Sequence, residues 1–510
     1  MNPDEFDLDE PIIYDDDDGS DDKISGIYDE QESEDNFFKA MKKKAGKMIK
    51  AKATKKTTPV EPEEPEEIEE PEEPVKKKRK INESKVLLAL DIGTEFIKAV
   101  IAEQKKDNLE IIGVGKAHQS AGNMYAGAIA DIPAVIATCE EALDKAEKMA
   151  GVVSKTAVVG IAGELIKGNT NTIRYRRKNG NKPISEQEMQ LIIKRVQERA
   201  GARARKEVAL ETGNPNVEVR LINSAIVSLS IDGYKVSNPI GFKGSDLLIQ
   251  FYTAFAPLVH ISAIEKVCAE LNLDLLAVAV EPFAVSRACL GDDLDSDFSA
   301  IMMDIGGGTT DIAVVDDGGV EGTKMFGIGG RSFTHQISQR VGCSFDFAER
   351  LKLNLNRDLL SDPDTVTIAD ALDANELTEY MEVPEQRKKI ELALKNNLDV
   401  WLSGIQIALD DFDIEVLPNK ILLCGGGAGL VKLQEVLATS NWYKECNFSR
   451  RPTVHLLDDI DIPGIKNQTD VDLDYSYVTA FGLLRVGLDT LAGSDEETGW
   501  RAKLEKLLKN

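Results

Sequence analysis

The segment Asp91-Ile92-Gly93-Thr94 has the residue types of a phosphate-binding turn. It follows the apolar stretch VLLALDI, and a tight turn with Gly93 and Thr94 presents backbone N–H groups to phosphate oxygens. Lys98 lies on the next predicted strand, where its point charge can reach a β- or γ-phosphate. Such a segment alone is more often an ordinary turn between strands.

A second segment is far more specific. After the apolar stretch AIMMDI, which ends at Asp304-Ile305, come Gly306, Gly307, Gly308, Thr309 and Thr310. Three consecutive glycines between two apolar strands cost conformational entropy and pack nothing, so a function explains them better than the fold does. We expect their backbone to contact phosphate. Asp304 at the strand end suits the hydration shell of Mg²⁺, because magnesium keeps several of its waters.

A third glycine run follows the buried stretch ILLC and consists of Gly425, Gly426 and Gly427. A run of this kind lets an adenosine lie against the backbone. The alternative is a helix-entry turn with close strand packing. The three segments in this order predict an ATP site.

The elements that must position these loops alternate between strand and helix patterns, which predicts an α/β fold. Two strand–turn–strand units lie some 210 residues apart and suggest a duplicated architecture. Between them, PISEQEMQLIIKRVQERA begins with a capping box at Ser185 and reads as a basic helix of an inserted unit. The predicted division is a charged tail (1–84), a first domain (85–174 and 258–296), an inserted subdomain (175–257), a second domain (297–330 and 416–490), its helical subdomain (331–415), and a linker with a terminal helix (491–510).

Composition excludes several classes of protein. The net charge of −27 argues against nucleic-acid binding, because phosphate backbones repel an anionic surface. No apolar run reaches the roughly 18 residues of a spanning helix, and MNPDEFDLDE lacks the features of a signal peptide. Six scattered cysteines favour reduced thiols and the cytoplasm.

Residues 1–84 hold 26 acidic and 15 basic residues and read as a disordered tail. Within them, FFKAMKKKAGKMIKAK is a candidate basic amphipathic helix and is equally consistent with a charged linker.

These loops resemble those of the actin-like ATPase superfamily, and over residues 85–510 the sequence is most similar to the bacterial cell-division FtsA family. The resemblance includes PISEQEM, DLLAVAVEPFA, DIGGGTTDIAVV, GIGGRSF, FAERLKL and YVTAFGLL. It implies an actin-like two-domain fold with an FtsA-type inserted subdomain. The long charged tail departs from the compact N-terminus usual in the family.

The same resemblance implies the roles of individual residues. Asp91 and Asp304 would organise Mg²⁺ through water, and Glu281 would orient the attacking water. Glu281 before Pro282 is equally consistent with a helix N-terminal acid. The resemblance places the remaining nucleotide contacts at Gly329, Gly330, Glu349 and Lys352. A Glu/Lys pair at i, i+3 is otherwise usually a surface ion pair.

The C-terminal segment GWRAKLEKLLKN places Trp500, Leu504, Leu507 and Leu508 on one helical face, with lysines and an arginine around them. This pattern is typical of an interfacial membrane anchor, although a helix docked on the body would share it. Family members end in such a helix, which attaches them to the cytoplasmic membrane.

The resemblance implies a membrane-associated polymer subunit at the division site that binds ATP, self-associates into filaments and receives the C-terminal peptide of FtsZ. ATP would act as an assembly switch, with weak hydrolysis at most. Two alternatives stay open: a PilM-like scaffold for type IV pili, and a small-molecule kinase of the same superfamily.

Overall fold

The structure is a computed structural model and describes residues 85–105, 108–290, 297–360, 383–412 and 414–492. The predicted charged tail and the predicted C-terminal membrane helix therefore lie outside the described residues. Within these ranges, no helix has the length and apolar character needed to cross a membrane.

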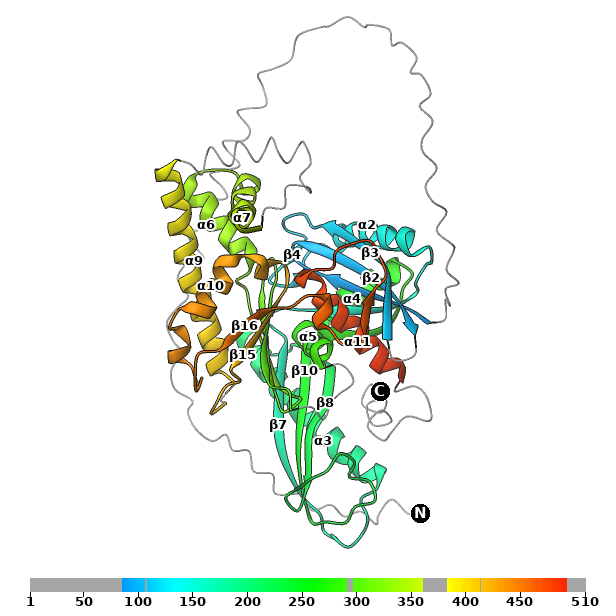
Figure 1. Cartoon of the computed structure of the whole chain (residues 1–510). Helices are drawn as coiled ribbons and strands as arrows, with labels where there is room; N and C mark the ends of the chain where they lie inside the picture. Colours follow the sequence, from blue (N-terminus) through cyan, green and yellow to red (C-terminus); the bar gives the residue numbers. More distant parts are fainter. Residues whose placement is uncertain (1–84, 106–107, 291–296, 361–382, 413, 493–510) are drawn as a thin grey trace, which may run out of the picture. The chain divides into compact units, whose positions relative to one another are not determined.

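The first sheet has six strands in the order β11-β6-β1-β2-β3-β17 (Figure 1). Its strands are β1 (Val86–Ile92), β2 (Phe96–Lys105), β3 (Asn108–His118), β6 (Thr156–Ile161), β11 (Asp274–Val280) and β17 (Ile465–Asn467). The pairs β1–β2 and β2–β3 are antiparallel, whereas β6 joins β1 and β11 in parallel. All seven residues of β1 are buried, as its continuous apolar sequence predicts.

The second sheet has nine strands in the order β16-β15-β12-β13-β14-β7-β10-β8-β9. Its strands are β7 (Lys167–Arg176), β8 (Val219–Ile231), β9 (Tyr234–Lys235), β10 (Asp246–Pro257), β12 (Ala300–Ile305), β13 (Thr310–Asp316), β14 (Gly319–Phe326), β15 (Lys420–Cys424) and β16 (Thr453–Leu456). In its first five strands, β12 pairs antiparallel with β13 and parallel with β15, as β1 pairs with β2 and β6. The two halves therefore repeat one strand pattern, which confirms the predicted α/β fold class.

Two helices fill the space between the sheets. α5 (Glu281–Leu290) packs on β12 and β13, and α11 (Val478–Ala492) packs on β1 and β6. The helices also pack on each other, and a Cβ at Gly482 of α11 would lie only 2.1 Å from the Ala284 carbonyl oxygen of α5. Gly482 thus permits a close crossing that any larger residue would obstruct.

The C-terminal part of the chain returns to the first sheet. β17 extends that sheet by pairing in parallel with β3, and α11 contributes to the apolar core around β1. β17 and all but the last two residues of α11 fall within the segment 416–490 of the predicted second domain. Their apolar residues are buried against the first sheet. This part of the segment therefore packs with the first domain, although it follows the second domain in the sequence.

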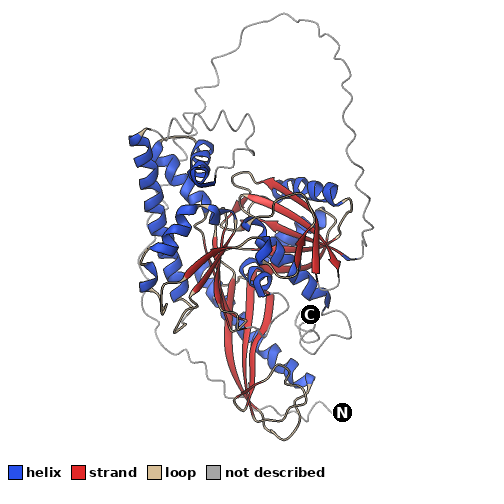
Figure 2. Cartoon of the chain, in the orientation of Figure 1, coloured by secondary structure: helices blue, strands red, loops and turns tan. Residues whose placement is uncertain are grey.

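Further helices cover the outer faces of the sheets (Figure 2). They are α2 (Ile132–Ala150), α4 (Leu258–Glu270), α6 (Gly330–Val341), α7 (Phe345–Leu360), α9 (Pro384–Asp410) and α10 (Val431–Thr439). α2 shows why these segments are helical: Asp131 caps its N-terminus by accepting from the Ala134 N–H at 3.1 Å, and Gly151 ends it with φ of 67°. α6, α9 and α10 share one apolar core with β12 and β15, and Trp401 is fully buried in it.

The inserted unit has an apolar core of its own, formed by α3 (Glu186–Thr212) and strands β7, β8 and β10. The predicted helix start is confirmed, because the Ser185 hydroxyl accepts from the Glu188 N–H at 3.2 Å. β7 has no counterpart among the predicted elements. It pairs with β10 along most of its length and with β14 at Gly168 and Asn169, which joins the inserted unit to the second sheet.

Candidate functional site

The two predicted phosphate turns face each other. Each one joins the first two strands of its half: 93–95 connects β1 to β2, and 306–309 connects β12 to β13. A Cβ at Gly308 would lie 2.8 Å from the Thr94 hydroxyl oxygen, and one at Gly307 would lie 2.7 Å from the Glu95 Cβ. The glycines therefore allow an approach between the two turns that side chains would prevent.

Beside the turns lies a group of buried acidic residues. Asp91 and Lys98 are opposite each other in the β1–β2 register, and the Lys98 Nζ donates to Asp91 Oδ2 at 2.8 Å. Asp304, at the end of β12, accepts a hydrogen bond from the Thr479 hydroxyl at the start of α11. Glu281, the first residue of α5, is only 8% exposed. A Cβ at Gly160 would lie 3.1 Å from Glu281 Oε1, so the glycine leaves room for this carboxyl group.

The electrostatics of the group favour a cation. Burial raises the pKa of Glu281 well above its ordinary value, and the nearby Asp91, Asp311 and Asp304 carboxylates raise it further. Burial also raises the pKa of Asp304, partly offset by the Thr479 hydrogen bond. For Lys98, burial lowers the pKa, yet the pull of Asp91 outweighs it and the net shift is upward.

Two further observations test whether Mg²⁺ fits. Asp311 Oδ1 is buried and has no hydrogen-bond partner among the described residues, which leaves negative charge uncompensated. The described ranges hold no group of three His, Cys, Asp or Glu side chains able to ligate a metal ion directly. The buried carboxylates of Asp91 and Asp304, with the unpartnered Asp311 Oδ1 nearby, offer acceptors that would suit the water shell of a hydrated Mg²⁺.

The third glycine run lies against the second turn. Gly425 has φ of 82°, and a Cβ there would lie 2.0 Å from Asp304 Oδ1; its N–H donates to the Tyr475 carbonyl at 3.0 Å. A Cβ at Gly427 would lie 2.8 Å from the Ile305 carbonyl oxygen. At Gly426, by contrast, a Cβ would meet nothing within 4 Å. The backbone at Gly426 thus faces open space beside the acidic group.

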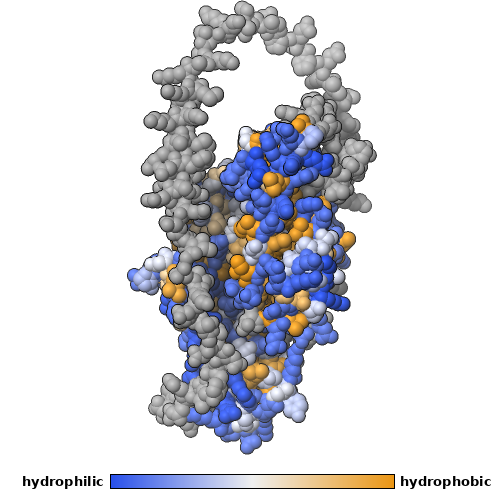
Figure 3. Space-filling view, turned by 90° about the vertical axis from the view of Figure 1, so that its left-hand side faces the viewer, coloured by the Kyte–Doolittle hydropathy of each residue, from blue (hydrophilic) through white to orange (hydrophobic). Residues whose placement is uncertain are grey.

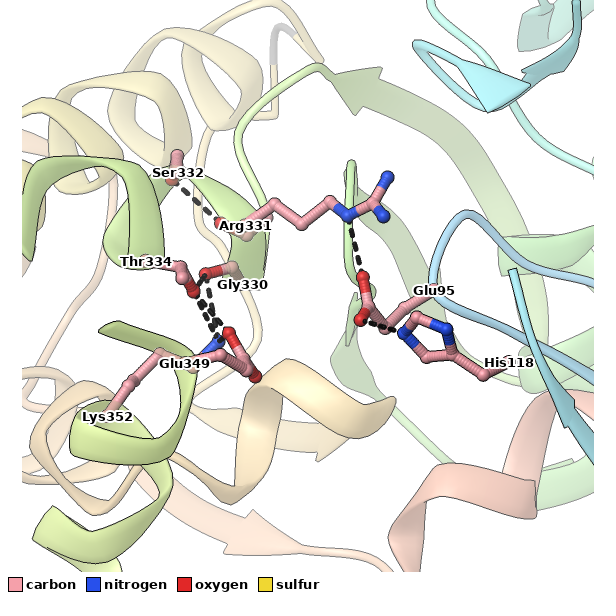
Figure 4. Close-up of polar contacts among 9 residues, drawn as sticks. Glu95, His118, Gly330, Arg331, Ser332, Thr334, Glu349 and Lys352 are labelled. Carbon is pink, nitrogen blue, oxygen red and sulfur yellow. Dashed lines mark hydrogen bonds and ion pairs between the residues drawn. The ribbon is translucent and has the colours of Figure 1, made fainter. Parts of the chain in front are cut away.

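The residues predicted to flank the adenosine gather at the start of α6 (Figure 4). The Lys352 Nζ lies 2.8 Å from Glu349 Oε2 and donates to the Gly330 carbonyl at 3.1 Å and to the Thr334 hydroxyl at 2.9 Å. Gly329 precedes α6, and the Gly330 N–H donates to the Gly306 carbonyl at 2.9 Å. Glu349 and Lys352 therefore belong to a partly buried hydrogen-bond network, which reaches the second phosphate turn through Gly330.

The two threonines of the second turn have different surroundings. The Thr310 hydroxyl donates to the Ile328 carbonyl at 2.7 Å and accepts from the Trp401 Nε1 at 2.9 Å, so it belongs to the core. The Thr309 hydroxyl donates to Asp311 Oδ2 at 3.3 Å, beside the acidic group.

Several residues of the site were not predicted. Glu95 forms an ion pair of 2.6 Å with Arg331 Nε and contacts His118 Nε2 at 2.9 Å, which links the first turn to α6 (Figure 4). Thr479 and Gly160 support Asp304 and Glu281. The sequence does hold signals that could have pointed to Thr479 and Gly160. Thr479 is the polar residue in the mainly apolar YVTAFGLL, and Gly160 interrupts the apolar strand TAVVGI.

Comparisons with known proteins show which proteins this chain is similar to. A sequence model described as "Cell division protein FtsA" matches residues 301–463. The chain is 26% identical over 422 residues to the cell division protein FtsA of Pseudomonas aeruginosa, covering 80% of this chain and 90% of the relative. The FtsA of Bacillus subtilis is 25% identical over 357 residues, covering 69% of this chain and 75% of the relative. Over most of its length, the chain is therefore similar to FtsA proteins.

The fold of the chain is similar to a solved structure of another kind. A chain of the "PilM-PilN type IV pilus biogenesis complex" matches with a TM-score of 0.55 and 15% identity, covering 79% of this chain and 98% of that chain. At this identity the match concerns the fold alone. Together with the repeated strand pattern, it confirms the predicted actin-like architecture.

Proposed function

We propose that this protein is a member of the FtsA family and binds ATP with hydrated Mg²⁺ where its three glycine turns meet. The observation that carries the proposal is the convergence of the two phosphate turns and the open backbone of Gly426 around the buried acidic group. Lys98 and the backbone N–H groups of Gly93, Thr94 and Gly306–Thr310 would contact phosphate oxygens. The adenosine would lie along Gly425–Gly427, with Glu349 and Lys352 at its edge.

Slow hydrolysis is part of the same proposal. A bound magnesium ion would supply positive charge at the phosphates, and the chain's own contribution would be Glu281, which orients the attacking water. A carboxyl group accepts a proton only when it is ionised, and the raised pKa of Glu281 opposes ionisation. The site is thus better suited to holding a nucleotide than to rapid turnover.

The cellular role that we propose follows the relatives' name, cell division protein. Nucleotide binding favours head-to-tail self-association into filaments at the cytoplasmic face of the membrane. The helical subdomain 331–415 receives the C-terminal peptide of FtsZ. Residues 491–510 attach the protein to the membrane through Trp500, Leu504, Leu507 and Leu508.

Gly426→Ala tests the nucleotide site. Its methyl group enters open space, so the unfolding temperature should stay unchanged while the Kd for Mg·ATP, measured by fluorescence titration, rises at least tenfold. Gly425→Ala is the contrasting variant, because its methyl group would overlap Asp304 and should lower both stability and affinity. Unchanged affinity in a folded Gly426→Ala protein would disprove the proposed position of the adenosine.

Co-sedimentation of the full chain with FtsZ, anionic vesicles and ATP tests the cellular role. The double variant W500E/L504E should lose sedimentation with vesicles and keep nucleotide binding. Failure to bind an FtsZ C-terminal peptide would favour a pilus-type scaffold, and ATP turnover that depends on a metabolite would favour a kinase.

A further inference from the structure

The inserted unit carries a charge opposite to that of the rest of the chain. Residues 167–257 hold 15 Lys and Arg but 8 Asp and Glu, a net charge of +7, whereas the whole chain carries −27. A region of one sign in a protein of the other sign attracts partners of complementary charge.

Six of these bases lie on α3, although the helix also carries five acids, so its own net charge is +1. Helical spacing places five basic residues on the side away from the buried Ile193 and Ala204. They are Lys194, Arg195, Arg199, Arg205 and Lys206. None of these five forms an ion pair within the described part of the chain, although Arg203 on the same helix pairs with Glu207 at 3.0 Å.

Apolar side chains accompany these cations. Leu191 and Leu210 of α3 are 48% and 74% exposed, and Ala202 is exposed between them. We call this surface of α3, with its five cations, the exposed Glu198 and these apolar residues, the α3 face. Its chemistry matches an acidic segment that also carries aliphatic and aromatic residues.

The chain itself contains a segment of that description. Residues 1–35, which lie outside the described residues, hold 16 Asp and Glu and the single base Lys23, a net charge of −15. Apolar residues alternate with the acids in DEFDLDEPIIYDDDD. We propose that residues 1–35 dock on the α3 face of the same chain, covering it until a competing acidic partner displaces them.

Because residues 1–35 belong to the same chain as the α3 face, their docking is favoured over that of a separate acidic partner. The 49 residues from 36 to 84 span about 160 Å at full extension, four times the roughly 40 Å length of α3. A tethered segment meets its site at an effective concentration in the millimolar range, so contacts that are individually weak suffice. Because the attraction is between exposed charges, it should weaken as salt is added.

A zero-length carbodiimide cross-linker tests the proposal on the full chain, because it joins a carboxylate to a lysine amine in direct contact. Mass spectrometry at low salt should find residues 1–35 linked to Lys194 and Lys206. The variant R199E/R205E leaves both reporter lysines, Lys194 and Lys206, in place. Both substituted side chains are exposed, so the change should not disturb the fold. Its cross-links should fall at least fivefold, as should those of the unaltered chain in 0.5 M salt. An unchanged unfolding temperature checks that the variant is folded.

The matched control is K235E/K243E, which makes the same change in net charge elsewhere in the inserted unit and should keep the cross-links. Equal loss in both variants, or links from residues 1–35 to other lysines, would overturn the proposal. A mixture of ¹⁴N- and ¹⁵N-labelled chains should give links within one isotope; mixed links would show docking between copies instead. If R199E/R205E loses binding to phosphatidylglycerol vesicles and keeps the cross-links, the α3 face is a membrane surface and the proposal fails.

Discussion

Four buried carboxyl groups lie near one ammonium group at the centre of the site. Asp91, Glu281, Asp304 and Asp311 are each less than 10% exposed, and Lys98 is the basic residue that offsets them in the described structure. Burying carboxylates with too few partners costs free energy, and burial raises the pKa values of Glu281, Asp304 and Asp311. We therefore expect a cation bound at this site to stabilise the protein.

Glu281→Gln should reveal this cost through its pH dependence. Since folding raises the pKa of Glu281 above its ordinary 4.5, the folded chain holds the proton longer than the unfolded chain does. Stability consequently falls as pH rises from 4.5 through the folded-state pKa. At neutral pH the neutral glutamine should raise the free energy of unfolding by on the order of 1 kcal/mol, and near pH 4 the difference should vanish.

Thermal unfolding of both proteins between pH 4 and pH 8, without nucleotide, measures this difference. A glutamine variant that is less stable than the parent at neutral pH would show that Glu281 is ionised and well paired in the folded chain.

At the scale of elements, the crossing of α5 and α11 holds the acidic group together. α5 begins with Glu281, and α11 brings Thr479 to Asp304. Arg287 of α5 also pairs with Asp489 of α11 at 2.9 Å. The positions of the two helices thus set the positions of two of the four carboxyl groups.

Gly482→Ala should destabilise the protein through this crossing. Its methyl group would lie 2.1 Å from the Ala284 carbonyl oxygen, so α5 and α11 must separate, at a cost of about 1–3 kcal/mol. Gly426→Ala adds the same methyl group in open space and serves as the control in a denaturant titration. Equal stability of the two variants would mean that the helices do not cross as closely as described.

The local parts of the site were predictable from sequence, whereas its long-range contacts were not. An aspartate followed by glycines between two apolar strands specifies a turn within a few residues, so the loops at Asp91 and Asp304 were found directly. The partner of Asp304, Thr479, is 175 residues away and depends on where α11 packs. β7 was missed because KGNTNTIRYR lacks an apolar alternation, and its pairing with β10 decides its conformation. The Thr310 hydroxyl could not be assigned to the core without knowing that Trp401 lies beside it.

At the scale of the whole folded part, the Glu95–Arg331 ion pair joins the two repeated halves at the phosphate turns. The side chains of Glu95 and Arg331 are about one-fifth exposed, and the pair lies beside the turns that we propose to bind phosphate. The carboxylate of Glu95 should therefore repel an incoming phosphate. It also neutralises the guanidinium group of Arg331, which would otherwise attract that phosphate.

Glu95→Gln should accordingly tighten the binding of Mg·ATP by about threefold to tenfold at low salt, an effect of the size that one nearby charge produces. Titrations at low and high ionic strength measure it, and the gain should shrink as salt is added. Arg331→Gln should act in the opposite direction. Weaker binding by Glu95→Gln would indicate that the ion pair positions the turns for the nucleotide.

The return of the C-terminal segment to the first sheet has a consequence for the order of synthesis. A ribosome makes β1 to β3 early, but β17 and α11, which complete their sheet edge and core, are among the last described residues to emerge. Until Thr479 is available, the carboxylate of Asp304 lacks its hydroxyl donor and the cavity between the sheets lacks a helix. A chain truncated before residue 465 should thus have neither a complete first half nor the proposed nucleotide site. The nucleotide binding that we propose would therefore also report that translation has reached the end of the fold.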